Sequence, residues 1–426
     1  MAILLFASFI LFLVIDVPIA VALGLAGVVA LWWLGNIPLM LVITRMVAGI
    51  DNFPLLAVPM FILAGSIMEK GGAAVQLVRL ASALVGFIRG GLGMVVIVAT
   101  ILFSGVSGSS VADTAAIGSL MLPAMEKKGY PLEFATALVV AAGGMGILIP
   151  PCITMIIYAY LANASVGALF IGGIIPGLIM GVGLMVLTYF IARQYGFPAE
   201  ARASFREVGR AFAQSSWALL TLVIILGGIV GGIFTATEAA VVAVLYSLFV
   251  GTVVYGELRW SHLPKILLDA AITTSVVMLV VSTSAIFAWV LANQQIPEKV
   301  AQAIVSFSNQ PWVFLLIVNL LMLVVGTFLD ATPALMILVP ILLPIAMGLG
   351  IDPIHFGVVL VANLGIGFIT PPVGVTLFVA TSITKVPIAR VVKPLLPYFL
   401  VMVATLLLIT YVPWFTIVLP RLFMGY

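Results

Sequence analysis

Gly-Met-Gly-Ile-Leu-Ile-Pro-Pro at residues 144–151 recurs as Gly-Ile-Gly-Phe-Ile-Thr-Pro-Pro at residues 365–372, which is 221 positions later in the chain. The same offset pairs Gly105 with Gly326. A shared pattern of glycines and prolines at one fixed offset indicates an internal repeat. The sequence therefore predicts a chain built from two copies of one structural unit.

Each copy of the motif interrupts an apolar run that would otherwise form one helix. Glycine weakens a helix, and a proline removes a backbone donor and forces the preceding residue out of the helical region. We therefore expect a discontinuous transmembrane helix at about residues 133–162 and again at about 355–384. Because proline is accepted in a first helical turn, the second half should restart at the prolines.

The composition places the whole chain in a membrane. Of 426 residues, 64% are hydrophobic and only 7% are charged, whereas about a quarter of the residues of a soluble domain are charged. Apolar runs of about 17–25 residues, the length of a transmembrane helix, follow one another throughout. The sequence predicts an all-α polytopic membrane protein with about 10–11 spans. The ten that can be placed are at about residues 2–15, 19–34, 53–68, 134–161, 168–192, 217–234, 239–255, 266–291, 356–383 and 391–419.

A second shared element precedes each broken span. Residues 90–125 and 311–347 are apolar with small or polar residues in the middle. Each arm has about 14 residues, fewer than the roughly 20 of a full span, so we expect a re-entrant hairpin in each copy. The segments before the hairpins, 71–88 and 297–309, have the pattern of interfacial helices. The predicted units are a first repeat at 1–193, a cytoplasmic linker at 194–215 and a second repeat at 216–426.

The basic residues predict the orientation of the two copies. Arg89, Lys127 and Lys128 flank the first hairpin, and no basic residue flanks the second. Because lysine and arginine concentrate on the cytoplasmic side, the hairpins should enter from opposite faces as inverted-topology repeats. This path places 14 of the 17 basic residues inside; those outside are Arg45, Lys299 and Arg421.

The chain lacks the motifs of the common enzyme classes. It has neither a G-x-x-x-x-G-K-[ST] phosphate loop nor an H-E-x-x-H zinc motif, and it has a single cysteine. We therefore expect no enzymatic activity, no nucleotide or redox cofactor and no nucleic-acid partner.

Helix ends at the hairpin tips and breaks are the polar groups left for binding. Carbonyl and hydroxyl oxygens there suit Na+, and half-helix N-termini suit an anion, as in transporters with broken helices. For Asp113 and Asp330 a helix cap or a hydrogen bond to backbone donors is an equally weighted alternative. The predicted sodium ligands are Ser107, Gly108, Ser109, Gly143, Gly144, Gly146, Thr327, Asp330, Thr332, Gly365 and Gly367. The predicted substrate contacts are Ser110, Asp113, Pro150, Pro151, Thr332, Thr370, Pro371, Pro372 and Thr376.

Four stretches carry a family resemblance. Ser-Gly-Ser-Ser-Val-Ala-Asp-Thr-Ala-Ala-Ile-Gly at 107–118, Ile-Pro-Pro at 149–151, Gly-Ile-Phe-Thr-Ala-Thr-Glu-Ala-Ala at 232–240 and Thr-Pro-Pro at 370–372 resemble the large membrane subunit of tripartite ATP-independent periplasmic (TRAP) transporters. Many members have proline where this chain has Ala236, so the loop geometry there is left open.

The resemblance implies import of a carboxylate-bearing solute, driven by two or more Na+, across the bacterial inner membrane by an elevator motion. It also implies two partners, a small membrane subunit and a periplasmic substrate-binding protein. Two alternatives stay open: a stand-alone Na+- or H+-coupled di- or tricarboxylate transporter, and an anion channel. C4-dicarboxylates, sialic acids and sugar acids are all candidate substrates.

Overall fold

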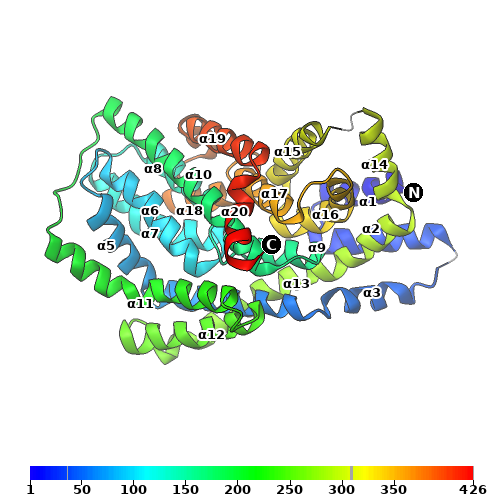
Figure 1. Cartoon of the computed structure of the whole chain (residues 1–426), viewed down its shortest axis with the longest axis horizontal. Coiled ribbons are helices and arrows are strands. Elements are labelled where there is room, and N and C mark those ends of the chain that lie inside the picture. Colours follow the sequence, from blue (N-terminus) through cyan, green and yellow to red (C-terminus); the bar gives the residue numbers. More distant parts are fainter. Residues whose placement is uncertain (36, 308–309, 426) are drawn as a thin grey trace.

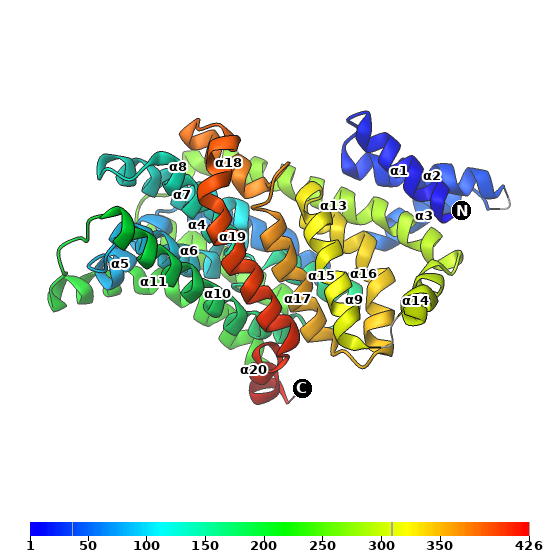
Figure 2. The same ribbon diagram turned by 90° about the horizontal axis from the view of Figure 1, so that it is seen from above.

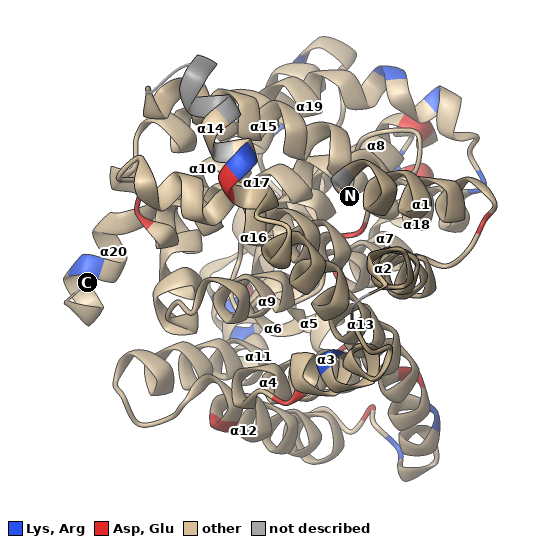
Figure 3. Ribbon diagram, turned by 90° about the vertical axis from the view of Figure 1, so that its right-hand side faces the viewer, with Lys and Arg blue, Asp and Glu red and all other residues tan. Residues whose placement is uncertain are grey.

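The computed structural model describes the chain except for residues 36, 308, 309 and 426. The described part is helical and holds no strand (Figure 1). Most of the ribbon is uncharged, and the charged residues lie mostly near the outside of the molecule (Figure 3). The prediction of an all-α polytopic membrane protein is confirmed.

Within the described residues, eight helical segments are long and apolar enough to cross a membrane. Six of them correspond to predicted spans and two are hairpin arms. The six contain α4 (Ala57–Lys70), α10 (Val166–Tyr195), α11 (Phe205–Val230), α12 (Ala236–Phe249), α13 (Leu263–Asn293) and α19 (Ile388–Tyr411). The two arms are α15 (Pro311–Phe328) and α16 (Ala331–Gly348).

The other four predicted spans consist of shorter helices. At the N-terminus α1 (Ala2–Val14) and α2 (Ile19–Leu34) are separate, because the chain turns at Asp16 with a φ of 65°. The two broken spans each contain two half-helices. These are α8 (Leu132–Gly146) with α9 (Ile153–Ala162), and α17 (Pro353–Gly367) with α18 (Val375–Thr384).

The offset of 221 residues recurs in the helix bounds. Shifted by 221, α6 (Gly91–Ser107), α7 (Ser110–Lys127), α8 and α9 fall on α15, α16, α17 and α18 to within one residue at each end. A proline pair stands in each break, at Pro150–Pro151 and Pro371–Pro372. The two halves thus share the same order and length of elements in this region.

The structure corrects two predicted lengths in the repeat. The hairpin arms have 17 or 18 residues, longer than the expected 14, and each tip is only two residues long. The half-helices also restart later than the prolines, at Ile153 and Val375. The second proline of each pair disfavours the helical region for the first, so the first proline stays outside the helix. How deeply the hairpins enter the bilayer stays a prediction.

Three further boundaries differ from the sequence prediction. Residues 40–50, placed between two spans, form α3 (Met40–Ile50). The predicted linker ends early, because α11 begins at Phe205 behind a capping box of Ser204 and Glu207. The last predicted span is two helices, α19 and α20 (Trp414–Met424), separated at Pro413.

The segments predicted as interfacial helices are helical. They form α5 (Ala73–Val85) and α14 (Ile296–Phe307). The predicted end of the second segment, Asn309, lies outside the described residues. Their position at a membrane surface stays a prediction.

The first halves of the broken spans form the centre of the molecule. Every residue from Phe134 to Gly146 in α8 and from Ile354 to Gly367 in α17 is buried. The hairpin arms surround them, and α10 and α19 run side by side over the centre (Figure 2). α4, α12 and α13 pack together on one side. The first break, at residues 147–152, is buried in protein, whereas Pro372 and Val373 of the second break are exposed.

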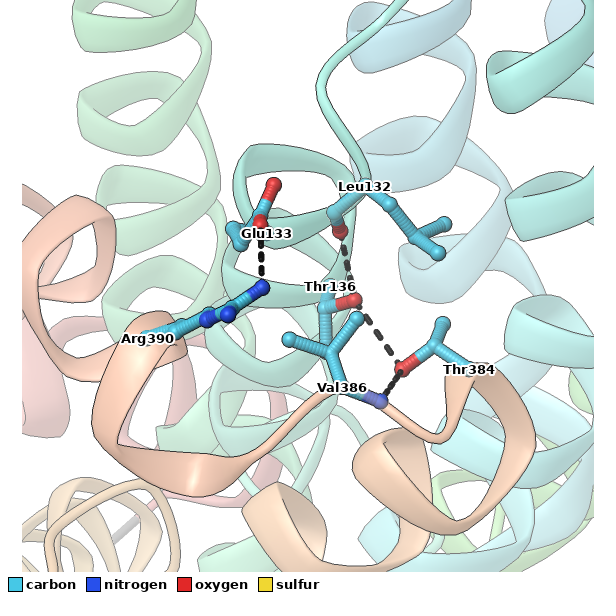
Figure 4. A network of polar contacts seen from close by, with 6 residues as sticks. All are labelled: Leu132, Glu133, Thr136, Thr384, Val386 and Arg390. Atoms are coloured by element: carbon cyan, nitrogen blue, oxygen red, sulfur yellow. Dashed lines mark hydrogen bonds and ion pairs between the residues drawn. The ribbon is translucent and has the colours of Figure 1, made fainter.

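The two broken spans run antiparallel. At one end the start of α8 lies against the end of α18, where Thr136 Oγ1 is 3.3 Å from Thr384 Oγ1 (Figure 4). At the other end the Tyr158 hydroxyl of α9 donates to the Pro353 carbonyl at the start of α17, at 2.7 Å. Inverted repeats produce this arrangement. The orientation of each copy relative to the bilayer stays a prediction.

Candidate functional site

The first hairpin tip is a turn that docks on the first break. Gly108 has a φ of +69°, which glycine adopts without strain, and the Ser109 side chain then caps α7 by accepting from the backbone N–H of Ala112. The Gly108 carbonyl accepts a hydrogen bond of 3.4 Å from the N–H of Ile153, the first residue of α9. This bond fixes the tip against the second half of the broken span.

The second tip has a different local structure at the equivalent place. Leu329 and Asp330 are both extended, and Asp330 stands at the N-cap of α16. Its side chain makes no capping hydrogen bond of the kind that Ser109 makes, but its carboxylate accepts from the backbone N–H of Ala331. A hydrogen bond to a backbone donor is one of the arrangements weighed for Asp330.

Both tips line one cavity of about 420 Å³. Ser107 to Ser110 contribute from the first hairpin and Asp330 to Thr332 from the second. Ile147, Ile153, Thr154 and Phe368 contribute from the two breaks. The opposite wall belongs to α4 and α13; its residues are Ile62, Gly65, Ser66, Glu69, Thr273 and Val277. The cavity thus lies between the hairpins and their flanking helices.

The buried hydroxyl of Ser110, on the cavity wall, has no hydrogen-bond partner among the described residues. Ser110 is 4% exposed, and its Oγ makes no hydrogen bond to a described residue. A buried polar atom without a partner costs free energy, so such an atom at a cavity wall suits a bound ligand or ion.

Asp113 lies beneath the first tip and is completely buried. Its two carboxylate oxygens accept hydrogen bonds from the hydroxyls of Ser104 and Ser107. Gly146 of the broken span packs against this cluster, since a Cβ there would lie 2.6 Å from an Asp113 oxygen. Ser107 also lines the cavity. The cluster is therefore linked to the cavity through Ser107.

The predicted site residues divide into two groups. Those that line the cavity are Ser107, Gly108, Ser109, Ser110, Asp330 and Thr332. The remaining ones lie behind the cavity wall or elsewhere; they are Asp113, Gly143, Gly144, Gly146, Pro150, Pro151, Thr327, Gly365, Gly367, Thr370, Pro371, Pro372 and Thr376.

Three predicted threonines donate to their own local backbone. The hydroxyl of Thr376 donates to the Phe368 carbonyl at 2.8 Å and so braces the second break. Those of Thr370 and Thr327 donate to carbonyls one turn earlier in their helices. In this conformation the three hydroxyls serve local structure.

The predicted site residues do not include Ser104, Thr154 and the polar residues of the opposite wall, Ser66, Glu69 and Thr273. Ser104 could have been predicted, because it is one of the small polar residues in the middle of the hairpin at 90–125. The wall residues could not, since nothing in their local sequence shows which helix faces the tips.

The cavity wall carries several polar groups, none of them basic. Among the described residues that line it, two are acidic and none is lysine or arginine. Its hydroxyl, carbonyl and carboxylate oxygens are the ligands that hard cations such as Na+ accept, and an anion can meet the N–H groups at the starts of α7 and α16.

The comparison with protein families decides the classification. The family model of the tripartite ATP-independent periplasmic transporter, DctM component, matches residues 6–415. The chain belongs to this family. This is a family of transporter permeases. The matched residues include both hairpins and both breaks.

Two relatives of similar identity differ in their named solute. The chain is 44% identical over 371 residues to the C4-dicarboxylate TRAP transporter large permease protein DctM of Pseudomonas aeruginosa, covering 87% of each chain. It is 43% identical over 382 residues to the sialic acid TRAP transporter large permease protein SiaM of Vibrio cholerae, covering 90% of each chain. Overall identity therefore does not select a substrate.

A solved structure shares the fold. The YdaH transporter of Alcanivorax borkumensis matches with a TM-score of 0.66 at 18% identity, covering 88% of each chain. At this identity the likeness concerns the fold alone.

Proposed function

We propose that this TRAP large permease chain imports a small carboxylate-bearing solute, driven by a Na+ gradient, across the bacterial inner membrane. The observation that carries the proposal is the convergence of both hairpin tips and both helix breaks on one cavity. Oxygen ligands and helix N-termini meet there, so one site has groups for both a cation and an anion.

The hairpins and broken spans are proposed to move together against α4 and α13 in an elevator-type motion. The antiparallel broken spans are joined at both ends, by Thr136 with Thr384 and by Tyr158 with Pro353. A group of helices tied in this way can move as one body. The cavity between this group and the flanking helices is where such a movement would open a path.

Two partners belong to the proposal: a small membrane subunit and a periplasmic substrate-binding protein that delivers the solute. The family description names a tripartite transporter. One relative is the isethionate TRAP transporter permease protein DctMQ of Oleidesulfovibrio alaskensis. This chain matches only 66% of its length, so that relative contains a further segment.

Reconstitution into proteoliposomes tests the proposal. The chain and the small subunit encoded with it are reconstituted, and uptake of radiolabelled dicarboxylates, sialic acid and sugar acids is measured with and without the binding protein. We expect uptake of one solute class only with an inward Na+ gradient and only with the binding protein.

The alternatives give different results in the same assay. Uptake without any binding protein would favour a stand-alone carrier and contradict the tripartite proposal. Uptake that does not depend on the Na+ gradient would contradict sodium coupling. Single-channel conductance in a planar bilayer would favour an anion channel.

A further inference from the structure

The α4 wall of the cavity carries one carboxylate, that of Glu69. The α4 residues that line the cavity are spaced three and four apart, at Ile62, Gly65, Ser66 and Glu69, so they share one helix face. Gly65 packs directly on the first tip, since a Cβ there would lie 2.6 Å from the Ser107 carbonyl oxygen. Glu69 follows one turn later on that face, which places its carboxylate beside the tip at the end of α4.

Glu69 is more exposed than the groups deeper in the cavity. Its side chain is 28% exposed and lies 3.6 Å from the ammonium of Lys70, which is 55% exposed. Asp113, below the tip, is completely buried, and Ser110 is 4% exposed. Glu69 thus lies nearer to solvent than these two groups, and Thr273 and Asp330 on the cavity wall are exposed as well. We call the open edge of the cavity at Glu69 its mouth.

A carboxylate at this mouth favours cations and disfavours anions in the cavity. The lining residues within the described ranges include no lysine or arginine to neutralise it. Its partner Lys70 lies adjacent in sequence at the end of α4, outside the cavity lining. A charge beside low-dielectric walls raises the local concentration of the opposite ion, so a carboxylate at this place can raise cation occupancy without coordinating the ion.

We propose that Glu69 is an electrostatic mouth residue that raises Na+ occupancy at the first hairpin tip before the anionic solute binds. This rests on the proposed sodium coupling. Lys70 opposes it by partly neutralising the carboxylate, so the two neighbours set the apparent Na+ affinity with opposite signs. Interactions through partly exposed, screened charges amount to a few-fold in binding.

Na+ titration of the purified detergent-solubilised protein tests this proposal. The melting temperature is measured against NaCl concentration, with choline chloride holding the ionic strength constant, because a ligand that binds the folded state raises that temperature. Relative to wild type, E69Q should raise the half-saturating Na+ concentration about threefold, and K70Q should lower it about twofold. E69D should stay close to wild type.

The control is E257Q. Glu257 lies beside Gly72, at the end of α4 that carries Glu69, but does not line the cavity. We expect no change in the Na+ midpoint. Unchanged midpoints in both E69Q and K70Q, with a clear Na+ effect on wild type, would overturn the role of Glu69. Absence of any Na+-specific effect on wild type would instead contradict the proposed sodium coupling. If E69Q does not fold, the half-saturating Na+ concentration of K70Q alone tests the proposal.

Discussion

Gly144 and Gly365, which are 221 positions apart, contact each other through their backbones. A Cβ on Gly144 would lie 2.7 Å from the Gly365 carbonyl oxygen, and a Cβ on Gly365 would meet the Gly144 carbonyl oxygen in return. Equivalent residues contact each other reciprocally only at a two-fold axis. The antiparallel course of α8 and α17 and this reciprocal contact agree with the predicted inverted repeat, whose orientation in the bilayer stays a prediction.

Replacing Gly365 by alanine should force this crossing apart. The obstructing atom is a backbone oxygen, which cannot rotate away as a side chain can. We expect G365A to lose about 1–3 kcal/mol of stability, the usual cost of overpacking, and to lower the melting temperature measured in detergent. G348A is the control, because a Cβ there has nothing within 4 Å. Equal melting temperatures would contradict the close crossing.

The Ser104 hydroxyl should stabilise the fold through Asp113. Removing it in S104A leaves the buried carboxylate with one donor fewer, which we expect to cost about 1–3 kcal/mol. T100V on the same helix is the matched control, since the buried Thr100 hydroxyl donates only to the Val96 carbonyl one turn away. The melting temperature of S104A should be clearly lower than that of T100V. The reverse order would contradict a stabilising role of the Ser104–Asp113 cluster.

The hairpin tips should be required for transport but not for insertion. In S109L and T332L a bulky apolar side chain replaces a hydroxyl at the cavity wall. We expect at least a tenfold loss of Na+-dependent uptake with wild-type amounts in the membrane. S119L, on the exposed side of the first hairpin, should transport normally. Unchanged sodium dependence in both tip variants would exclude these tips from the ion sites.

Loss of the exposed ion pair between the repeats should destabilise the protein less than loss of a threonine hydroxyl beside it. Glu133 and Arg390 are 4.0 Å apart with side chains 38% and 71% exposed, so R390A should cost less than about 1 kcal/mol. Thr136 is buried and donates at 2.6 Å to the Leu132 carbonyl (Figure 4), so T136V should cost about 1 kcal/mol. The melting temperatures of the two variants are compared. A larger decrease in R390A than in T136V would contradict this prediction.

The repeat could be predicted because its signal consists of glycines and prolines. These residues act on the backbone directly, so Gly144 with Gly365 and the two proline pairs mark the same breaks whatever side chains surround them. The helix α3 was missed because residues 40–50 are too short for a span; it packs on α13. The break before α20 was missed although Pro413 marks it in the sequence.

The site could be predicted in part for a related reason. The tips that line the cavity, such as Ser109 and Thr332, belong to the repeat, so their convergence follows from its symmetry. Glu69 and Thr273 come from helices outside the repeated hairpin and break elements. Their place opposite the tips depends on how α4 and α13 pack, which local sequence does not reveal.

The most direct test of the account is the side of the membrane that each hairpin base faces. Single cysteines are placed at Lys127 and at Gly348, both exposed, in a C152A background, because Cys152 is the only native cysteine. Labelling of intact cells and inverted vesicles with a membrane-impermeant maleimide should modify K127C only from the cytoplasmic side and G348C only from the periplasmic side. Labelling of both from the same side would contradict the inverted repeat.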